Sequence, residues 1–558
     1  MSDDAHATLN GRRRPGVPIP LAPAQRWFLA QDPVDPNRYN QSIALRFRAP
    51  VSLRFVRGAL QHVTAAHDAF GLRFRRSPAG QWLQFATGDV DMPVETADLS
   101  RLAAAQQATA LEEVARRLHS SLDLAAGPVA RASLVNLGDR ENALLVMVAH
   151  HLIVDAVSWR ILADDIEDAC AAVQEGRPVS LAGSTSFSSW ASALAARAGG
   201  CDDQVAGWLA RIPQRDSWPS ADTATAPLTG EARTPHRRSL RVDAMATGRL
   251  LAATGSACGI EHMLLAAVGS AISAALSISG VLIDVETHGR DDMGTGVDVS
   301  RTVGWLTSTW PLNIEAGELS TMALAALLAA DIRALPSGGM SYGTLRWVAE
   351  RAEIRALPQA RVLFTYLGRY QSRPAAGRHV DWVPGPEGDS FTAFRSSPYV
   401  LTVNAWVQDD ELMIDWLLRA DFPGTESIAE AADAFLAALL EAADADSGGL
   451  PGASTLPVVQ PASATEVTIL AAWQEVLGAP MSSNSWAEVT EREIGVEDDF
   501  IDIGGDSIHM IQIVSRLRRA FGVRIPLSVV REYSTVRSLA VKVDSMLAAD
   551  HEDIRRRS

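Results

Sequence analysis

The chain has 558 residues and a formal net charge of −16, with 47% apolar and 21% charged residues. These values are typical of a folded, soluble protein with three or four globular units. The negative charge argues against a nucleic-acid partner. No signal core or run of about 18 apolar residues is present, so we expect a cytoplasmic protein without a membrane partner. The three cysteines, Cys170, Cys201 and Cys258, have neither disulfide nor metal-ligand spacing.

The first part of the chain predicts an α/β unit. Residues 1–17 are polar and basic, and we expect a flexible N-terminal segment there. Residues 18–180 alternate strand-like and helical patterns. The alternation in Ile43–Phe47 and the continuous apolar run Ala143–Ala149 predict strands, the second of them buried, and Ala110–Leu122 predicts a helix.

The middle of the chain continues with a second α/β unit. Residues 181–235 are rich in Ser, Ala, Gly, Pro and Thr, and Ser217–Pro235 predicts an exposed connection. Residues 236–446 again alternate strand and helix patterns, with an Ala/Leu-rich core or interface helix near 323–335. Turn-forming residues then predict a linker over 447–463.

The last part predicts a small, all-helical unit over residues 464–547, followed by a tail over 548–558. Its expected helices are Val467–Leu477, Ser507–Phe521 and Val536–Leu547. The segment Ala479–Glu491 interrupts this unit like an insertion after the first of these helices.

Two adjacent histidines, His150 and His151, follow the buried strand and so lie where it ends. Histidine at such a position can act as a base near neutral pH. Asp155, four residues on, can orient a ring or brace the loop. The same pattern also fits a pair of packed core histidines.

A second candidate site is Ser507, which follows Gly504, Gly505 and Asp506 at the start of an amphipathic helix. The glycines leave its hydroxyl unobstructed. From spacing alone, a helix-capping serine explains the pattern as well.

Residues 464–547 resemble the peptidyl carrier domain of nonribosomal peptide synthetases, by the Gly-Gly-Asp-Ser motif and the acidic-aromatic approach Asp498–Phe500. The resemblance implies a four-helix domain in which Ser507 carries covalent 4′-phosphopantetheine, attached by a phosphopantetheinyl transferase. Asp506 at its position is typical of carriers that partner epimerization domains.

Residues 18–446 resemble the condensation superfamily of the same synthetases, and specifically its epimerization domains. The His-His-x-x-x-Asp motif matches His150, His151 and Asp155. Ala156 and Thr287 replace the glycines of the family's motifs, and Thr365 replaces an asparagine. Other matching segments are Pro23–Phe28, Val157–Leu162, Glu286–Arg290, Arg301–Thr307 with Trp310 and Pro311, Pro336–Gly343, and Phe364–Gly368.

This resemblance implies an α/β fold of two lobes like chloramphenicol acetyltransferase, an N-lobe over about 18–180 and a C-lobe over about 236–446. The lobes would form a V-shaped pseudo-dimer with a central tunnel. It also implies an ion pair between Asp155 and Arg290 that braces the loop of His151.

Epimerization at an α-carbon removes a proton from one face and returns one to the other, so it needs an acid/base group on each face. We expect His151 and Glu286, from different lobes, to be this pair, with His150 packed behind His151. Supporting residues in the motifs are Ser158, Thr365, Tyr366 and His288, which is either a substrate contact or a packed loop histidine. Tyr342, Trp305 and Trp310 are expected to serve packing or to line the tunnel.

The sequence thus predicts an isomerase that converts a carrier-bound aminoacyl or peptidyl thioester from the L form to an L/D mixture, in nonribosomal peptide and antibiotic biosynthesis. The alternatives are an amide-forming condensation domain and a catalytically degenerate docking platform. The substrate would sit on the chain's own carrier, or on an upstream carrier docked with help from residues 1–17. This length holds no adenylation or thioesterase domain, so we expect adenylation and other synthetase proteins to act in trans.

Overall fold

The structure is a computed structural model. It describes residues 8–9, 12–13, 16–88, 90–138, 143–214, 218, 236–254, 258–291, 293–370, 378–383, 385–386, 399–419, 425–445, 459–477, 494–501 and 503–557. The predicted insertion Ala479–Glu491 lies outside these residues. So do nearly all of the connection Ser217–Pro235 and most of the linker 447–463.

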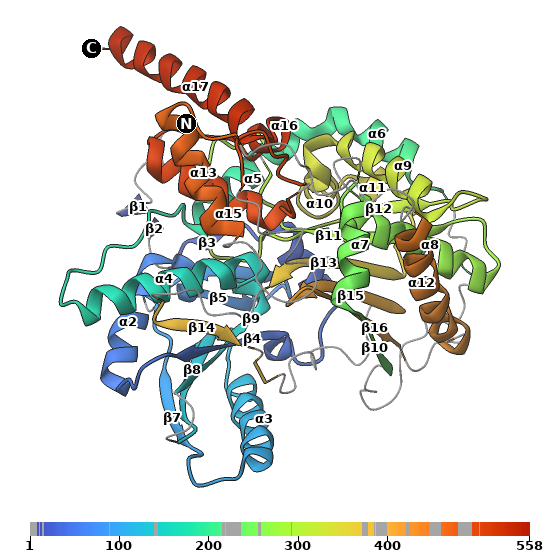
Figure 1. Cartoon of the computed structure of the whole chain (residues 1–558). Coiled ribbons are helices and arrows are strands. Elements are labelled where there is room, and N and C mark those ends of the chain that lie inside the picture. Colours follow the sequence, from blue (N-terminus) through green and yellow to red (C-terminus); the bar gives the residue numbers. More distant parts are fainter. Residues whose placement is uncertain are drawn as a thin grey trace.

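The N-terminal lobe is built on a sheet with the strand order β14-β4-β9-β8-β7 (Figure 1). Helix α3 packs on one face of this sheet, against β8 and β9, and α2 packs against α4. Every residue of β9 is buried, which explains its uninterrupted apolar sequence and confirms the predicted strand. The bounds are β4 Asn40–Phe47, β7 Val94–Asp98, β8 Ala130–Asn136, β9 Leu144–His150, α2 Leu53–Ala66, α3 Ala104–Ser120 and α4 Ala156–Gln174.

Strand β14 (Val380–Val383) belongs by sequence to the second lobe but completes the sheet of the first. It pairs antiparallel with β4, Val380 opposite Phe47 and Val383 opposite Ala44. Arg48 and Asp381 add an ion pair of 2.8 Å. The two α/β stretches of the sequence are therefore interlocked.

The C-terminal lobe has a sheet of strand order β10-β16-β15-β13-β11-β12. Helix α8 contacts β11, while α7 and α12 contact β16. Its elements are β10 His236–Val242, α7 Ala244–Thr254, α8 Ile260–Leu276, β11 Val281–Thr287, β12 Ser308–Ile314, α9 Thr321–Arg333, α10 Met340–Gly343, α11 Ala352–Arg355, β13 Val362–Tyr370, β15 Leu401–Gln408, β16 Glu411–Leu418 and α12 Thr425–Ala445.

Smaller elements complete the two lobes. Strands β3 (Pro18–Ile19), β6 (Trp82–Ala86) and β5 (Leu72–Arg76) form a further sheet, and α1 spans Pro23–Ala30. Short strands β1 (Thr8–Leu9) and β2 (Arg12–Arg13) pair within the segment expected to be flexible. The region 181–235, for which composition indicated no element, contains α5 (Phe187–Arg197) and α6 (Val205–Arg211), because buried Phe187, Trp190 and Trp208 anchor them.

The C-terminal unit contains α13 (Ala464–Leu477), α15 (Ser507–Phe521), α16 (Leu527–Glu532) and α17 (Val536–Arg557). The last helix continues through the expected tail. Asp506, and not Ser507, caps α15: its Oδ1 accepts hydrogen bonds from the N–H groups of Ile508 and His509, at 3.0 and 2.8 Å. Ser507 is therefore the first helical residue.

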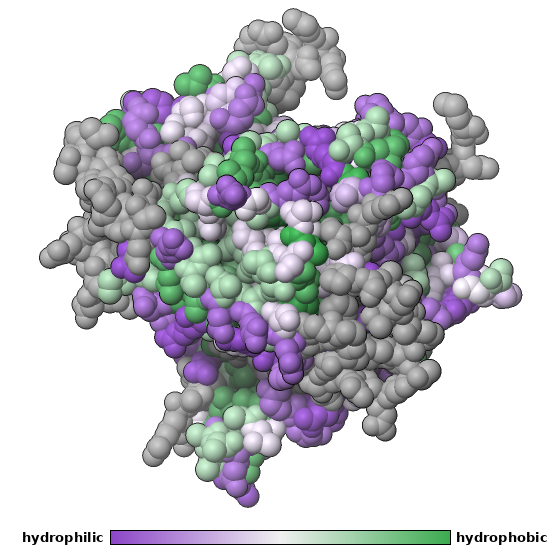
Figure 2. Space-filling view, turned by 90° about the vertical axis from the view of Figure 1, so that its right-hand side faces the viewer, coloured by the Kyte–Doolittle hydropathy of each residue, from purple (hydrophilic) through white to green (hydrophobic). Residues whose placement is uncertain are grey.

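The C-terminal unit lies above the seam between the blue-to-teal N-terminal lobe and the green-to-orange C-terminal lobe (Figure 1). The helices on the right of Figure 1 carry exposed apolar side chains such as Met245, Leu327 and Leu440. Figure 2, viewed from that side, shows hydrophilic and apolar residues mixed over this face. Among the described helices, none is both long and apolar enough to cross a bilayer.

Candidate active site

His150 is a packed histidine at the end of β9. It is completely buried, its Nε2–H donates to the carbonyl of Pro36 at 2.7 Å, and its Nδ1 accepts from the N–H of Leu152 at 3.1 Å. Burial lowers the pKa of His150 to about 3. With both nitrogens engaged and no charge at neutral pH, this side chain holds the loop in place.

His151 begins the short turn that follows β9, and its ring packs against two aromatic rings that also contact each other. The ring centroid is 5.1 Å from that of Tyr39, nearly parallel at 12°, and 4.3 Å from that of Trp305. Nδ1–H donates to the carbonyl of Val154 at 2.9 Å. Burial lowers the pKa of His151, so the ring is neutral and its Nε2 is a proton acceptor.

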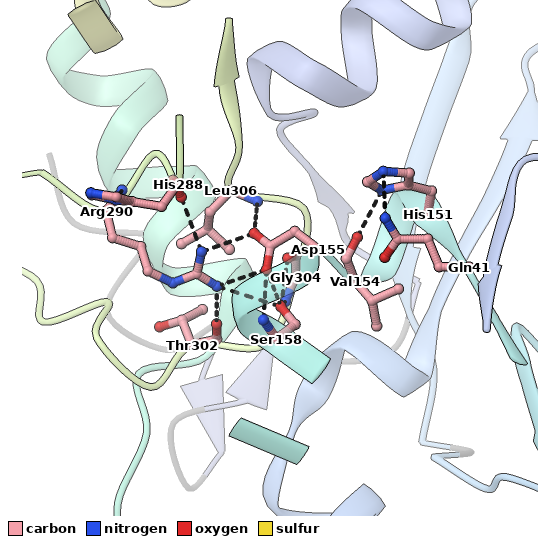
Figure 3. A network of polar contacts seen from close by, with 10 residues as sticks. All are labelled: Gln41, His151, Val154, Asp155, Ser158, His288, Arg290, Thr302, Gly304 and Leu306. Carbon is pink, nitrogen blue, oxygen red and sulfur yellow. Dashed lines mark hydrogen bonds and ion pairs between the residues drawn. The ribbon is translucent and has the colours of Figure 1, made fainter. Parts of the chain in front are cut away.

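Gln41 on β4 meets this acceptor nitrogen (Figure 3). The indole N–H of Trp159, which can only donate, is 2.9 Å from Gln41 Oε1. The amide nitrogen of Gln41 therefore faces His151 Nε2, 2.9 Å away, and donates to it. This hydrogen bond stabilises neutral His151 and must be released when the ring takes up a proton.

We expect Gln41→Leu to raise the pKa of His151, because the donor that favours the neutral ring is removed. Gln41→Glu should raise the pKa further, since a carboxylate favours the imidazolium. The measurement is an NMR pH titration of labelled histidine, with His151 assigned through His151→Ala. Gln61→Leu, an exposed glutamine on α2, is the matched control. An unchanged His151 titration in both Gln41 variants would contradict the assignment.

Glu286 lies near the end of β11 in the other lobe, opposite Thr365 of the parallel strand β13. Paired residues share a face of the sheet, so both side chains point the same way. Burial, and then the negative charge of Asp155, raise the pKa of Glu286 to about 7. Glu286 is thus protonated in part near neutral pH and can act as either acid or base.

The surroundings of Glu286 overlap with those of His151. Burial raises the pKa of Tyr39, which stacks on His151, and the charge of Glu286 raises it further. Asp284, two residues earlier on the same face of β11, accepts a hydrogen bond of 2.9 Å from the Tyr399 hydroxyl. Burial raises the pKa of Asp284 to about 6. The region between the lobes therefore holds carboxyl groups that keep their protons unusually well.

Asp155 is the centre of a buried polar network that joins the lobes (Figure 3). Its carboxylate accepts hydrogen bonds from Nη1 and Nη2 of Arg290, at 2.9 and 3.1 Å, and from the N–H of Leu306 at 3.0 Å. Burial opposes its ionisation, but Arg290 and Ser158 outweigh burial and lower the pKa of Asp155. The predicted ion pair is present, and it fixes the start of α4 directly after the His151 loop.

Ser158 and Arg290 extend this network across the lobe boundary. The Ser158 hydroxyl lies 2.7 Å from Asp155 Oδ1 and accepts from the N–H of Gly304 at 3.0 Å. Arg290 also donates to the carbonyls of His288 and Thr302, both at 3.0 Å. A different side-chain rotamer of Arg290 would break several of these hydrogen bonds. The network therefore stabilises this one arrangement of the loops that carry its members.

Of the departures from the family motifs, Ala156 has a local structural explanation. Ala156 is the first residue of helix α4, where alanine suits the backbone. Gly289 has φ +65°, and a side chain there would overlap the carbonyl oxygen of Leu306. His288 is committed to this loop, since its Nδ1 accepts from the Arg290 N–H at 2.9 Å and burial lowers its pKa.

Ser507 is partly exposed at the N-terminus of α15, where the positive end of the helix dipole favours a phosphate ester. Gly504 has φ +91°, and a Cβ on Gly505 would overlap the ring of Phe500. The chain before Ser507 therefore requires glycine. These features suit the attachment of a phosphate-linked arm to the Ser507 hydroxyl.

Comparison with known families decides the assignment. Residues 18–457 match the family model of the condensation domain, and residues 467–541 match that of the phosphopantetheine attachment site. The chain belongs to the condensation domain family. The second match indicates that this condensation-family chain carries covalent 4′-phosphopantetheine on a helical carrier domain.

Relatives of this condensation-family chain include chondramide synthase cmdD of Chondromyces crocatus, 32% identical over 75% of the chain. A component of the linear gramicidin synthase of Brevibacillus parabrevis is 31% identical over 76% of the chain. The chain spans 11% and 8% of the lengths of these two proteins.

Solved structures agree with the condensation-type fold. The epimerization domain from the third module of tyrocidine synthetase B has a TM-score of 0.65 and 26% identity, covering 77% of this chain and 97% of that one. The condensation domain from the Monacolin K polyketide synthase MokA has a TM-score of 0.61 and 15% identity, covering 77% and 98%. The predicted α/β fold of two lobes with a C-terminal carrier is thus confirmed, while the catalytic roles of individual residues stay predictions.

Sequence reasoning missed the residues that surround the predicted pair. Gln41 and Tyr39 reach His151 from β4 and the turn before it, and Tyr399 reaches Asp284 from the segment before β15. A signal was present only for Asp284, whose alternation with Glu286 along a strand places two carboxylates on one face.

Proposed function

We propose that the chain epimerizes the α-carbon of an aminoacyl or peptidyl thioester held on phosphopantetheine. The observation that carries this proposal is Glu286, a partly buried carboxyl group with a pKa of about 7, in the lobe opposite His151. A two-sided proton exchange needs such a second group, whereas amide formation by a condensation domain does not. The likeness to the tyrocidine epimerization domain supports the same reaction.

The residues act as follows in this proposal. Neutral His151 takes the α-proton through Nε2 once the Gln41 amide gives way, and protonated Glu286 returns a proton to the opposite face. The reverse direction exchanges these roles. The ion pair of Asp155 and Arg290 holds the His151 loop at a fixed position. When bound, the pantetheine thioester supplies the acidity of the α-proton.

Because the chain spans a small part of each relative, its place in an assembly is part of the proposal. The names of the relatives suggest a role in nonribosomal peptide synthesis, with other synthetase proteins supplying the acyl group. Ser507 would receive its arm from a phosphopantetheinyl transferase. Asp506, buried as the cap of α15, would orient the attachment site.

The test is deuterium wash-in at the α-carbon. A phosphopantetheinyl transferase loads Ser507 with L-alanyl, L-valyl, L-leucyl or L-phenylalanyl phosphopantetheine from the matching aminoacyl-coenzyme A, releasing adenosine 3′,5′-bisphosphate. The loaded chain is incubated in D₂O and analysed by mass spectrometry and chiral chromatography. In the wild type we expect deuterium incorporation and D-product. In His151→Ala both should decrease by about a hundredfold or more. Amide formation with a second loaded carrier, without wash-in, would favour condensation. If neither epimerization nor amide formation occurs with any of the four acyl groups, the result would favour a docking platform.

A further inference from the structure

We infer that the carrier at residues 464–547 docks on the seam between the two lobes and presents its own acyl group to them, in cis. This inference deepens the proposed function and rests on it for the identity of the reaction. The docking itself rests on contacts between the carrier and both lobes, and it has a separate test.

The first contact grips the loop immediately before Ser507. The backbone N–H of Arg369 donates to Asp506 Oδ2 at 3.2 Å, and its guanidinium donates to the carbonyl of Gly504 at 3.1 Å. Although burial opposes ionisation of Asp506, His509 and then Arg160 hold its pKa well below the usual range. The loop thus meets Arg369 of β13 and the positive charge of Arg160 of α4, whose guanidinium in turn donates to the carbonyl of Arg369 at 3.4 Å.

These two elements lead directly to the candidate catalytic groups. Helix α4 begins right after the His151 loop, with Asp155 as its cap. Strand β13 carries Thr365 opposite Glu286. Strand β13 has a bulge between Tyr366 and Arg369, so Arg369 lies only three strand steps beyond Thr365 in the pairing with β15. At about 3.3 Å per step, this is roughly 10 Å along the sheet. An arm on Ser507 therefore starts close to both the element that positions His151 and the strand beside Glu286.

The second contact consists of ion pairs in which the carrier supplies the positive charge and the C-terminal lobe the negative charge. Carrier residue Arg518 pairs with Asp298 and lies 3.2 Å from the Ser300 hydroxyl, and Arg531 pairs with Asp291 at 3.0 Å. Acidic residues of the C-terminal lobe thus meet arginines of the carrier, while its Asp506 meets arginines of the enzyme. Such alternation fixes one orientation of the carrier and disfavours carriers with other charges.

A small cavity beside the second contact brings apolar side chains of both domains together, next to Asp298 and Arg518. Ile511, Val514 and Leu527 of the carrier face Val299 of the C-terminal lobe around a cavity of about 30 Å³. Arg290, which braces Asp155, also lines this cavity. An apolar centre with a charged rim is the usual composition of a specific interface. The carrier thus rests on the loop that holds the active-site brace.

The connection between the two domains favours the same arrangement. Helix α12 ends at Ala445 and α13 begins at Ala464, so a short segment joins them. A tether of this kind gives an effective concentration on the order of millimolar, which allows even a weak interface to be occupied. A carrier on another protein would have to displace the tethered one from this surface.

A mixing experiment separates action in cis from action in trans. Ser507→Ala removes the attachment site but keeps His151, and His151→Ala keeps a loadable carrier. With the acyl group that exchanges fastest, we expect wild-type wash-in per molecule to be independent of protein concentration at about 1 µM, far below the tethered concentration. A mixture of the two variants should exchange at least about tenfold more slowly. Equal rates for mixture and wild type would overturn the inference.

Docking is also measured without chemistry, by amide hydrogen exchange on the unacylated holo chain. We expect protection of residues 298–301 to fall in Arg518→Asp and to return in the charge swap Arg518→Asp with Asp298→Arg. Glu353→Arg, an exposed reversal on α11, is the control and should change nothing. Protection that is unchanged in Arg518→Asp would overturn the docking. If no protein, including the wild type, shows deuterium wash-in, the proposed reaction is refuted. The docking would still stand if amide protection falls in Arg518→Asp and returns in the charge swap.

Discussion

Replacing Glu286 by glutamine is expected to reduce α-proton exchange by a factor of about a hundred to ten thousand, the usual contribution of a general acid or base. Glutamine keeps the shape of the side chain but cannot give or take the proton. Loading of the carrier should be unaffected, because Ser507 lies on a separate domain. The measurement is deuterium wash-in on the loaded chain, with Glu353→Gln on the exposed face of α11 as the matched control. Undiminished D-product in Glu286→Gln would refute the two-sided mechanism.

The raised pKa of Glu286 also predicts how the stability of Glu286→Gln relative to wild type depends on pH. The Glu286 carboxyl ionises near pH 4.3 in an unfolded chain, and its pKa in the folded protein is about 7. The folded state therefore holds this proton more tightly, and the stability that results is complete below about pH 4 and lost as the pH rises through 7. Glutamine never ionises, so the free energy of unfolding of Glu286→Gln relative to wild type should increase by up to about 3 kcal/mol from pH 4 to 8. Chemical denaturation at both pH values measures it, and a difference that is constant with pH would contradict the raised pKa.

Removal of the Asp155 carboxylate is expected to be the most destabilising change at the lobe boundary. In Asp155→Ala the guanidinium of Arg290 stays buried without its counter-charge, and the cap of α4 is lost. We expect a loss of about 3–5 kcal/mol in the free energy of unfolding. Thermal and chemical denaturation measure this loss. Asp433→Ala, which breaks the exposed ion pair with Arg238, should cost no more than about 1 kcal/mol and is the matched control.

A double-mutant cycle separates the charge from the packing. If the cost of Asp155→Leu comes mainly from the unpaired Arg290, the double variant Asp155→Leu with Arg290→Met should recover part of the stability. The double variant should still exchange the α-proton more slowly than wild type, because the His151 loop loses its anchor to Leu306. A cycle in which the two changes simply add would show that the residues do not act as a pair.

The elements that the sequence predicted correctly are those with a strong local signal. Strand β9 is buried on both faces and so is apolar throughout, and α15 has one apolar face and a distinct start at Asp506. Helices α5 and α6 were missed because Ser, Ala and Gly dominate their region, and their few large side chains act only through tertiary packing. Strand β14 was missed as a partner of β4, since four residues carry no signal about which lobe they join.

The candidate site divides in the same way. Motif residues could be found from resemblance, but the hydrogen bond of Gln41 to His151 and that of Tyr399 to Asp284 join segments far apart in sequence. The contact of Arg369 with the Gly504–Asp506 loop spans two domains. No local pattern encodes such contacts, because each depends on how whole lobes pack.

The pairing of β14 with the sheet of the first lobe has a consequence for co-translational folding. Strand β4 cannot pair with β14 until the ribosome has synthesised the chain as far as Val380, the partner of Phe47. Until then β4 presents unpaired backbone groups at a sheet edge, the kind of surface that recruits foreign strands. Pairing across so long a loop is intrinsically slow. Nascent chains should therefore pass through an aggregation-prone stage, and expression of the first lobe alone should yield little soluble protein unless residues 378–386 are supplied.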